Sequence, residues 1–172
     1  METDWRSAYF MQAESDYRLF RQIARQDYVP LCQKLHYLQM TTEKMSKGFS
    51  TQPHSGKYPN THKAFADFIQ DVAKKEKRLW RLCGFSPSES KKFDAYLKKV
   101  GAKAKLIEAL APAGGSSQPN PEYPWETNGG AIITPVEYDF PDLDLYDKKM
   151  QDMLGFLDHC FELIASEIEN EK

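Results

Sequence analysis

Residues 143–168, LDLYDKKMQDMLGFLDHCFELIASEI, are the stretch that decides the fold. Their apolar residues recur at steps of three or four, the spacing that stacks side chains on one face of an α-helix. This apolar face consists of Leu143, Tyr146, Met150, Met153, Leu154, Leu157, Phe161, Ile164 and Ile168. Such a helix gains its stability by packing its apolar face against other helices, so the sequence predicts a helical bundle.

The N-terminal part of the chain has the same periodicity. Apolar residues spaced for a helix run from Trp5 to Tyr28, and either Thr3 or Asp4 can cap its start. Pro30 interrupts this pattern because proline lacks a backbone N–H and clashes with the preceding turn. Either one long helix kinks at Pro30, or a second helix starts there. We favour a second helix, about Val29 to Lys47, roughly in line with the first.

Two further helices are expected in the middle of the chain. The first covers residues 61–83 and ends at Gly84, a residue suited to the left-handed position after a helix. Ser86-Pro87-Ser88-Glu89 is a capping box and opens the next helix. Gly101 is expected to stop that helix, with a short helical continuation at residues 102–111.

These patterns predict an all-α fold for residues 1–172 as a single domain. The expected architecture is an up-and-down bundle of four main helices, the first kinked or broken at Pro30. Gly, Pro, Asn and Ser/Thr in residues 48–60 indicate a loop. Residues 112–142 are a long Pro/Gly-rich crossover before the last helix.

The crossover divides into two parts by composition. Residues 121–141 are rich in aromatic and branched apolar residues, so we expect them to pack along the bundle while residues 112–120 stay mobile. Four acidic residues lie around the start of the last helix: Asp139, Asp142, Asp144 and Asp147. The pattern of a calcium-binding loop is missing. We therefore expect Asp142 to cap the helix and its neighbours to favour the positive end of the helix dipole.

Composition places the chain among intracellular, cytoplasmic proteins. No apolar run approaches the ~20 residues that span a bilayer, so we expect no membrane partner. The N-terminus lacks a basic region followed by an apolar one, so no secretory signal is expected. The widely spaced cysteines Cys32, Cys83 and Cys160 are expected to be reduced, partly buried thiols.

Charge is unevenly distributed along the chain. Residues 57–105 carry thirteen Lys/Arg and five Asp/Glu, whereas residues 106–172 carry three and fourteen. The basic third is either a footprint for nucleic acid, or its helices lie beside acidic ones and the charges neutralise each other. We favour neutralisation, because mixed surface charge keeps a small bundle soluble.

The sequence carries no recognised catalytic, cofactor-binding or metal-binding motif, so we predict no catalytic residues, no cofactor and no metal. Cys32 and His36 share a helix face, but no second pair has metal-ligand spacing. His54-Ser55-Gly56-Lys57 lacks the strand and the further residues of a phosphate-binding loop. We therefore expect a protein that is not an enzyme.

Two functional hypotheses remain. The first is an interaction protein (an adaptor, inhibitor or small subunit) that binds another protein or itself through helix faces and the aromatic part of the crossover. Its candidate partner-binding residues are Tyr123, Trp125, Tyr138 and Phe140. For Trp125 we favour the alternative that it fills a groove between helices. The second is a nucleic-acid-binding protein whose candidate residues are Lys74, Lys77, Arg78, Arg81, Lys91, Lys98 and Lys105.

Overall fold

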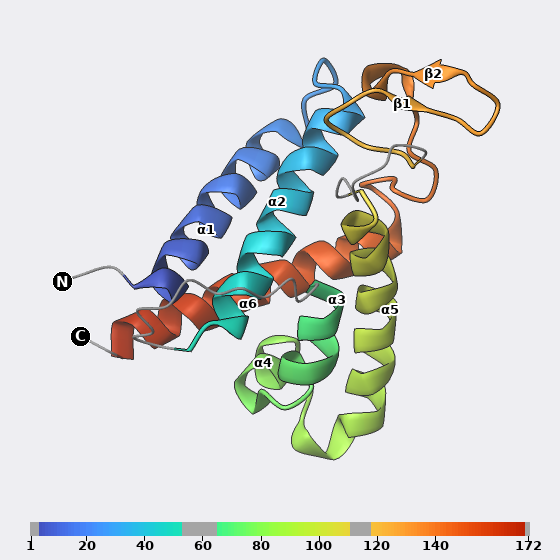
Figure 1. The fold of residues 1–172 in the computed structure, drawn as a ribbon. Coiled ribbons are helices and arrows are strands. Elements are labelled where there is room, and N and C mark those ends of the chain that lie inside the picture. The colour runs from blue at the N-terminus through green and yellow to red at the C-terminus, as the bar shows by residue number, and fades with distance from the viewer. Residues whose placement is uncertain (1–3, 53–64, 111–117, 171–172) are drawn as a thin grey trace.

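The computed structural model of the protein describes residues 4–52, 65–110 and 118–170 (Figure 1). Within these ranges the chain is mostly helical, so the predicted all-α class is confirmed. The long helices are α1 (Trp5–Ile23), α2 (Leu31–Ser50), α5 (Ser90–Glu108) and α6 (Lys148–Asn170). The arrangement departs from a simple series of four helices where the expected third helix is broken into short pieces.

Helices α1 and α2 form an antiparallel hairpin (Figure 1). The side chain of Asp4 caps α1 by accepting the Ser7 N–H at 2.8 Å, as its position in the sequence predicted. A second helix does begin after Pro30, but the prediction that it continues in line with the first is wrong. Residues 24–30 turn the chain back, so that Phe10 near the start of α1 contacts Phe49 near the end of α2.

The close approach of α1 and α2 depends on Gly48. A Cβ atom at this position would lie 2.4 Å from the ring of Phe10, which is closer than van der Waals contact permits. Gly48 is therefore buried inside α2, and the predicted loop at 48–60 begins too early, because α2 continues to Ser50. Residues 53–60 of that loop lie outside the described part of the chain.

The helix predicted at 61–83 is not continuous. Its described part consists of α3 (Phe65–Phe68), the π-helical turn η1 (Ile69–Ala73) and α4 (Lys77–Leu82). Polar groups stabilise the break: the indole N–H of Trp80 donates to the Lys74 carbonyl at 3.1 Å, and the Glu76 carboxylate accepts the Arg78 N–H at 2.8 Å. Gly84 follows α4 with φ +79°, which confirms its predicted left-handed conformation.

The predicted capping box is present: Ser86 and Glu89 bond each other's backbone around the short 3-10 helix η2 (Pro87–Glu89), which leads into α5. The prediction that Gly101 ends the helix is wrong, because α5 passes through Gly101 to Glu108. Gly101 is buried, and a Cβ there would lie 3.4 Å from Gln70 of η1. This is an ordinary contact distance, so the packing of η1 near α5 does not by itself require glycine at this position.

Helix α6 buries an extended apolar face. Its fully or nearly fully buried side chains are Met150, Met153, Leu154, Phe156, Leu157, Cys160, Leu163 and Ile164. The predicted apolar face is therefore largely correct, except that Tyr146 is 67% exposed. Helix α6 runs behind α2 in the view of Figure 1 and packs against α5.

The residue that caps the start of α6 is not the one predicted. The side chain of Asp147, not Asp142, caps the helix by accepting the Lys149 N–H at 2.6 Å. Asp144 accepts the Tyr146 N–H at 2.8 Å, which forms a separate turn before the helix. Asp142 has φ +70°, a left-handed conformation that cannot begin an α-helix.

We call residues 118–140 the hairpin segment. It lies beside the first turns of α2 and near the last turns of α5 (Figure 1). The strand β1 (Trp125–Glu126) pairs antiparallel with β2 (Ile132–Ile133), and the 3-10 turn η3 (Pro135–Glu137) follows. Trp125, Tyr138 and Phe140 pack edge to face in a small cluster, with centroid separations of 5.0–6.2 Å. The described part of 121–141 therefore packs on the helices as predicted, whereas residues 112–117 lie outside the described chain.

Candidate functional site

A groove with a volume of about 630 Å³ lies between the first turns of α2 and the hairpin segment. Cys32, Gln33, His36 and Tyr37 of α2 form one wall. The other wall is formed by Pro121, Glu122, Pro124, Thr134, Pro135 and Val136. Three prolines restrict the backbone of this second wall, so the shape of the groove is largely preformed.

One charged contact crosses the groove. Nδ1 of His36 lies 2.8 Å from a carboxylate oxygen of Glu122. This buried nitrogen has no partner with hydrogen-bond geometry, because the carboxylate lies away from the direction of the ring N–H. The contact is therefore an ion pair when the imidazole is protonated, and it joins α2 to the hairpin segment.

The four predicted partner-binding residues have different environments. Tyr123 is 61% exposed, whereas Trp125 and Phe140 are buried and Tyr138 is half-buried. Trp125 is thus buried and is not an exposed anchor, but its ring packs on Tyr138 and Phe140 of its own segment, so a position in a groove between helices stays a prediction. Trp125 and Phe140 instead hold the hairpin segment in place.

Sequence reasoning missed two exposed apolar residues of the hairpin segment, Ile132 and Val136, which are 76% and 58% exposed. Trp125 pairs with Ile133, and Glu126 pairs with Ile132, so alternation turns Ile132 away from the core. The signal was present in Asn128-Gly129-Gly130, since an Asn-Gly pair between two short extended runs is typical of a hairpin.

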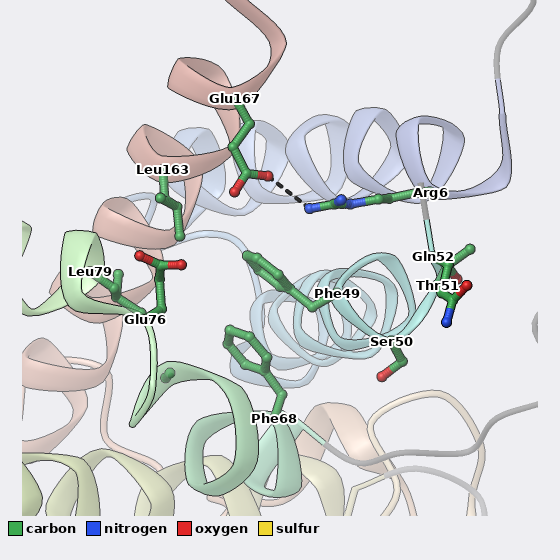
Figure 2. A pocket seen from close by; sticks show the side chains of 11 residues that line it. Arg6, Phe49, Ser50, Thr51, Gln52, Phe68, Glu76, Leu79, Leu163 and Glu167 are labelled. Atoms are coloured by element: carbon green, nitrogen blue, oxygen red, sulfur yellow. Dashed lines mark hydrogen bonds and ion pairs between the residues drawn. The ribbon is translucent and has the colours of Figure 1, made fainter. Parts of the chain in front are cut away.

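A second hollow, of about 250 Å³, lies where α1, α2, η1, α4 and α6 converge (Figure 2). Its floor is apolar and includes the stacked rings of Phe49 and Phe68, whose centroids are 4.3 Å apart. Polar side chains surround the mouth of the pocket: Arg6, Ser50, Thr51, Gln52, Glu76 and Glu167.

The charged groups of this pocket are already used in contacts between helices. Arg6 donates to Glu167 at 2.7 Å, and the guanidinium of Arg78 approaches the other oxygen of Glu167 at 3.8 Å. Glu76 accepts the backbone N–H of Arg78. These contacts fix the ends of α1 and α4 against α6, so the arrangement serves the fold and offers no separate acid and base for catalysis.

The predicted nucleic-acid-binding residues divide into two groups. Arg78 pairs with Glu167 of the acidic third, as the favoured interpretation predicted, whereas Lys74 pairs at 3.4 Å with Asp94, which lies in the basic third itself. Among the described residues, the other members form no ion pair and are exposed: Lys77, Arg81, Lys91, Lys98 and Lys105. The structure therefore supports neutralisation near α6 and leaves a set of uncompensated cations on α4 and α5.

The described histidines and cysteines form no cluster of three or more residues suited to a metal ion. Burial raises the pKa of the Cys83 thiol to about 12 and that of Cys160 well above its ordinary value, so both thiols are protonated at neutral pH. Cys32 and His36 both line the groove, as their shared helix face predicted. The stretch His54–Lys57 and His62 lie outside the described residues.

No helix in the described chain has both the length and the apolar composition needed to cross a membrane. Comparison with known proteins found no matching protein-family model, no matching curated protein and no matching solved structure.

Proposed function

We propose that the protein is a non-enzymatic interaction protein, and that it binds another protein chain at the groove between α2 and the hairpin segment. The observation that carries this proposal is the exposure of three apolar side chains of the hairpin segment: Val136, which lines the groove, Tyr123, which lies between the lining residues Glu122 and Pro124, and Ile132 of β2, at 58%, 61% and 76%. Water-exposed apolar side chains gathered around a concave surface are typical of protein-binding sites.

The groove is supported by a rigid base, which favours binding. The Trp125, Tyr138 and Phe140 cluster anchors the hairpin segment from below, while Pro121 and Pro135 pack as buried residues. Because the hairpin segment is already ordered, binding a partner costs little free energy for ordering it. A Tyr side chain has only two rotatable bonds, so Tyr123 also offers contact area at low entropic cost.

The contacts of the groove favour recognition over chemistry. Prolines, a valine and a threonine supply most of one wall, and the histidine and glutamate that face each other form a pair. A nucleophile activated by a neighbouring base is not among the groove residues, since burial raises the pKa of Cys32 and keeps it protonated.

Site-specific cross-linking tests the proposal. A photoreactive phenylalanine analogue replaces Ile132 or Val136 in the full-length chain, which is then irradiated in extract from its source cells. We expect both positions to give the same discrete adduct, identified by mass spectrometry as either a second copy of the chain or another protein.

Met11 is the matched control position, because it is exposed to a similar degree, 62%, but lies on α1. The analogue at Met11 should give no such adduct. Equal labelling at residues 11 and 132, or no discrete adduct at residues 132 and 136, would contradict the proposal.

A further inference from the structure

Helix α5 has a row of positive charges on one face. Lys91, Lys98 and Lys105 follow one another at intervals of seven residues, which is about two helical turns or roughly 10.5 Å. All three are exposed, and Ala95 and Ala102 are exposed between them. We call these three residues the lysine face; it lies on a helix at the edge of the helical part in Figure 1.

Several other cations on or beside α5 have carboxylate partners, unlike the lysine face. Lys74 lies 3.4 Å from Asp94, Lys92 lies 2.8 Å from Glu89, and Lys103 lies 2.5 Å from Asp147. In the described chain, Lys91, Lys98 and Lys105 have no carboxylate within the 4.0 Å of an ion pair. Uncompensated like charges on one helix face repel one another, so an anionic partner stabilises them.

Acidic residues close to the lysine face have other partners. Asp94 on the same helix forms an ion pair with Lys74. Glu108, one turn beyond Lys105, accepts the backbone N–H of Ala66 at 2.6 Å and thereby caps α3. Lys105 still exerts a weak electrostatic influence on Glu108, but neither carboxylate forms an ion pair with the lysine face, which is exposed to solvent.

We propose that the lysine face binds the phosphate backbone of a double-stranded nucleic acid. Its three charges span roughly 21 Å of a rigid, straight helix, and a duplex presents phosphates in a regular row of comparable extent. Lysine is a flexible point charge with no fixed bonding geometry, so it suits contacts with phosphates and not readout of base edges.

The surroundings of the lysine face favour a duplex over a single strand. Single-strand binding uses exposed aromatic rings on which bases stack. The nearby aromatic rings are engaged: Trp80 packs on Phe93 with centroids 4.9 Å apart, and its indole N–H donates to Lys74. Tyr96 is half-buried and donates its hydroxyl to the Asp152 carbonyl at 3.2 Å.

A membrane surface fits less well. Helices that bind an anionic bilayer insert large apolar side chains beside their lysines. Here the residues between the lysines are alanines, and Leu106 is the one exposed large apolar side chain among the described residues of α4 and α5, at 38%. The face therefore offers charge without an apolar anchor.

Fluorescence anisotropy with a labelled duplex of about 20 base pairs, longer than the lysine row, tests the proposal at several salt concentrations. We expect the full-length protein to bind with a dissociation constant below about 100 µM at ~50 mM salt. The triple variant K91A/K98A/K105A should bind at least about tenfold more weakly. Its slope of log affinity against log salt should be smaller in magnitude by about 2.7, since each lost phosphate contact removes roughly 0.9.

The matched control is R18A/K148A/K149A, which removes three exposed cations from α1 and α6 and changes the net charge equally. This control should keep the affinity and salt slope of the parent. Lysine-to-alanine changes on an exposed helix face preserve helix propensity, and circular dichroism will verify the fold of both variants.

Three results would overturn the proposal. The first is absence of duplex binding at ~50 mM salt with ~100 µM protein. The second is equal weakening by the control variant, which would mean that net charge alone governs binding. The third is lysine-dependent binding that is tighter to a single strand, or to vesicles containing phosphatidylserine, than to the duplex.

Discussion

Helix α6 and the hairpin segment both bury aromatic residues, but they do so by different means. Phe156 of α6 is fully buried and contacts Phe65 and Tyr96 from two other helices. Trp125 of the hairpin segment is buried mainly by Tyr138 and Phe140, which lie within fifteen residues of it. The comparison teaches that the core residues of α6 contact rings from other helices, whereas the hairpin segment joins the same core through rings that lie close together in the sequence.

The largest effect is expected from Phe156→Ala. This change removes a ring that several helices share and leaves a cavity, so the free energy of unfolding should fall by about 4 kcal/mol. Denaturant unfolding followed by circular dichroism measures it. Met11→Ala, on an exposed residue, should change the free energy by less than about 0.5 kcal/mol. A loss at residue 156 as small as that of the control would mean that α6 is not central.

A smaller global effect is expected from Trp125→Ala, about 2–3 kcal/mol, because the hairpin segment can open without unfolding the helices. Hydrogen exchange distinguishes the two regions. The Thr127 amide, which donates to the Ala131 carbonyl at 2.8 Å, should lose protection, while amides of α6 keep theirs. Equal loss of protection in both regions would show that the hairpin segment and the helices unfold as one unit.

Tyr17→Phe tests how much the Tyr17 hydroxyl stabilises the contact between α1 and α6. The hydroxyl of Tyr17 donates to Asp158 at 2.8 Å and lies 3.2 Å from the Leu154 carbonyl, while its ring stacks on Phe161. Phenylalanine keeps the stacking and removes the hydroxyl, so we expect a loss of about 1 kcal/mol in unfolding free energy. An unchanged denaturation midpoint would show that the ring, and not the hydroxyl, positions α1.

Lys103→Met should have the smallest effect at neutral pH and a characteristic effect in acid. Lys103 is buried on α5 and reaches both the Asp142 carbonyl and the Asp147 carboxylate at 2.5 Å, so it connects α5 to the start of α6. Its hydrogen bond is the main cause that lowers the pKa of Asp147 from the ordinary 3.8. Methionine keeps the length and apolar stem of the side chain without the charge.

The sign of the acid effect follows from that lowered pKa. In the parent protein, stability from the ionised Asp147 is fully present above about pH 4 and is lost as pH falls through the lowered folded value. In the variant the folded pKa of Asp147 moves back toward 3.8, so acidification below pH 4 should reduce stability less steeply than in the parent. Carboxyl NMR titration measures the pKa of Asp147 directly, and an unchanged value would exclude the contact with Lys103 as its cause.

Features set by local chemistry were predictable from the sequence. The Ser86–Glu89 capping box, the Asp4 cap and the left-handed Gly84 each follow from a few neighbouring residues. The apolar face of α6 follows from a period that persists over many turns. For the candidate groove, sequence reasoning identified the aromatic segment and Tyr123 and favoured burial of Trp125, but it missed the exposed Ile132 and Val136.

Predictions failed where distant residues override local preference. Gly101 is a residue type that often follows a helix, yet α5 continues through it, and Gly101 is buried against the neighbouring elements. The helix expected at 61–83 breaks because Trp80 and Glu76 satisfy backbone groups in the turn between η1 and α4. Pro30 signals an end to α1, but it does not encode the direction in which the chain continues.

The sequence by itself determined the helical class, some helix caps and the side chains available for burial, because periodicity and capping act over one or two turns. The tertiary structure alone decided the antiparallel α1–α2 hairpin, the groove beside His36 and the division of the cations. Arg78 forms an ion pair with Glu167, which lies 89 positions later in the chain. Lys91, Lys98 and Lys105 form no ion pair with a carboxylate among the described residues. Such outcomes depend on which surfaces pack together, and no local pattern of residues specifies that.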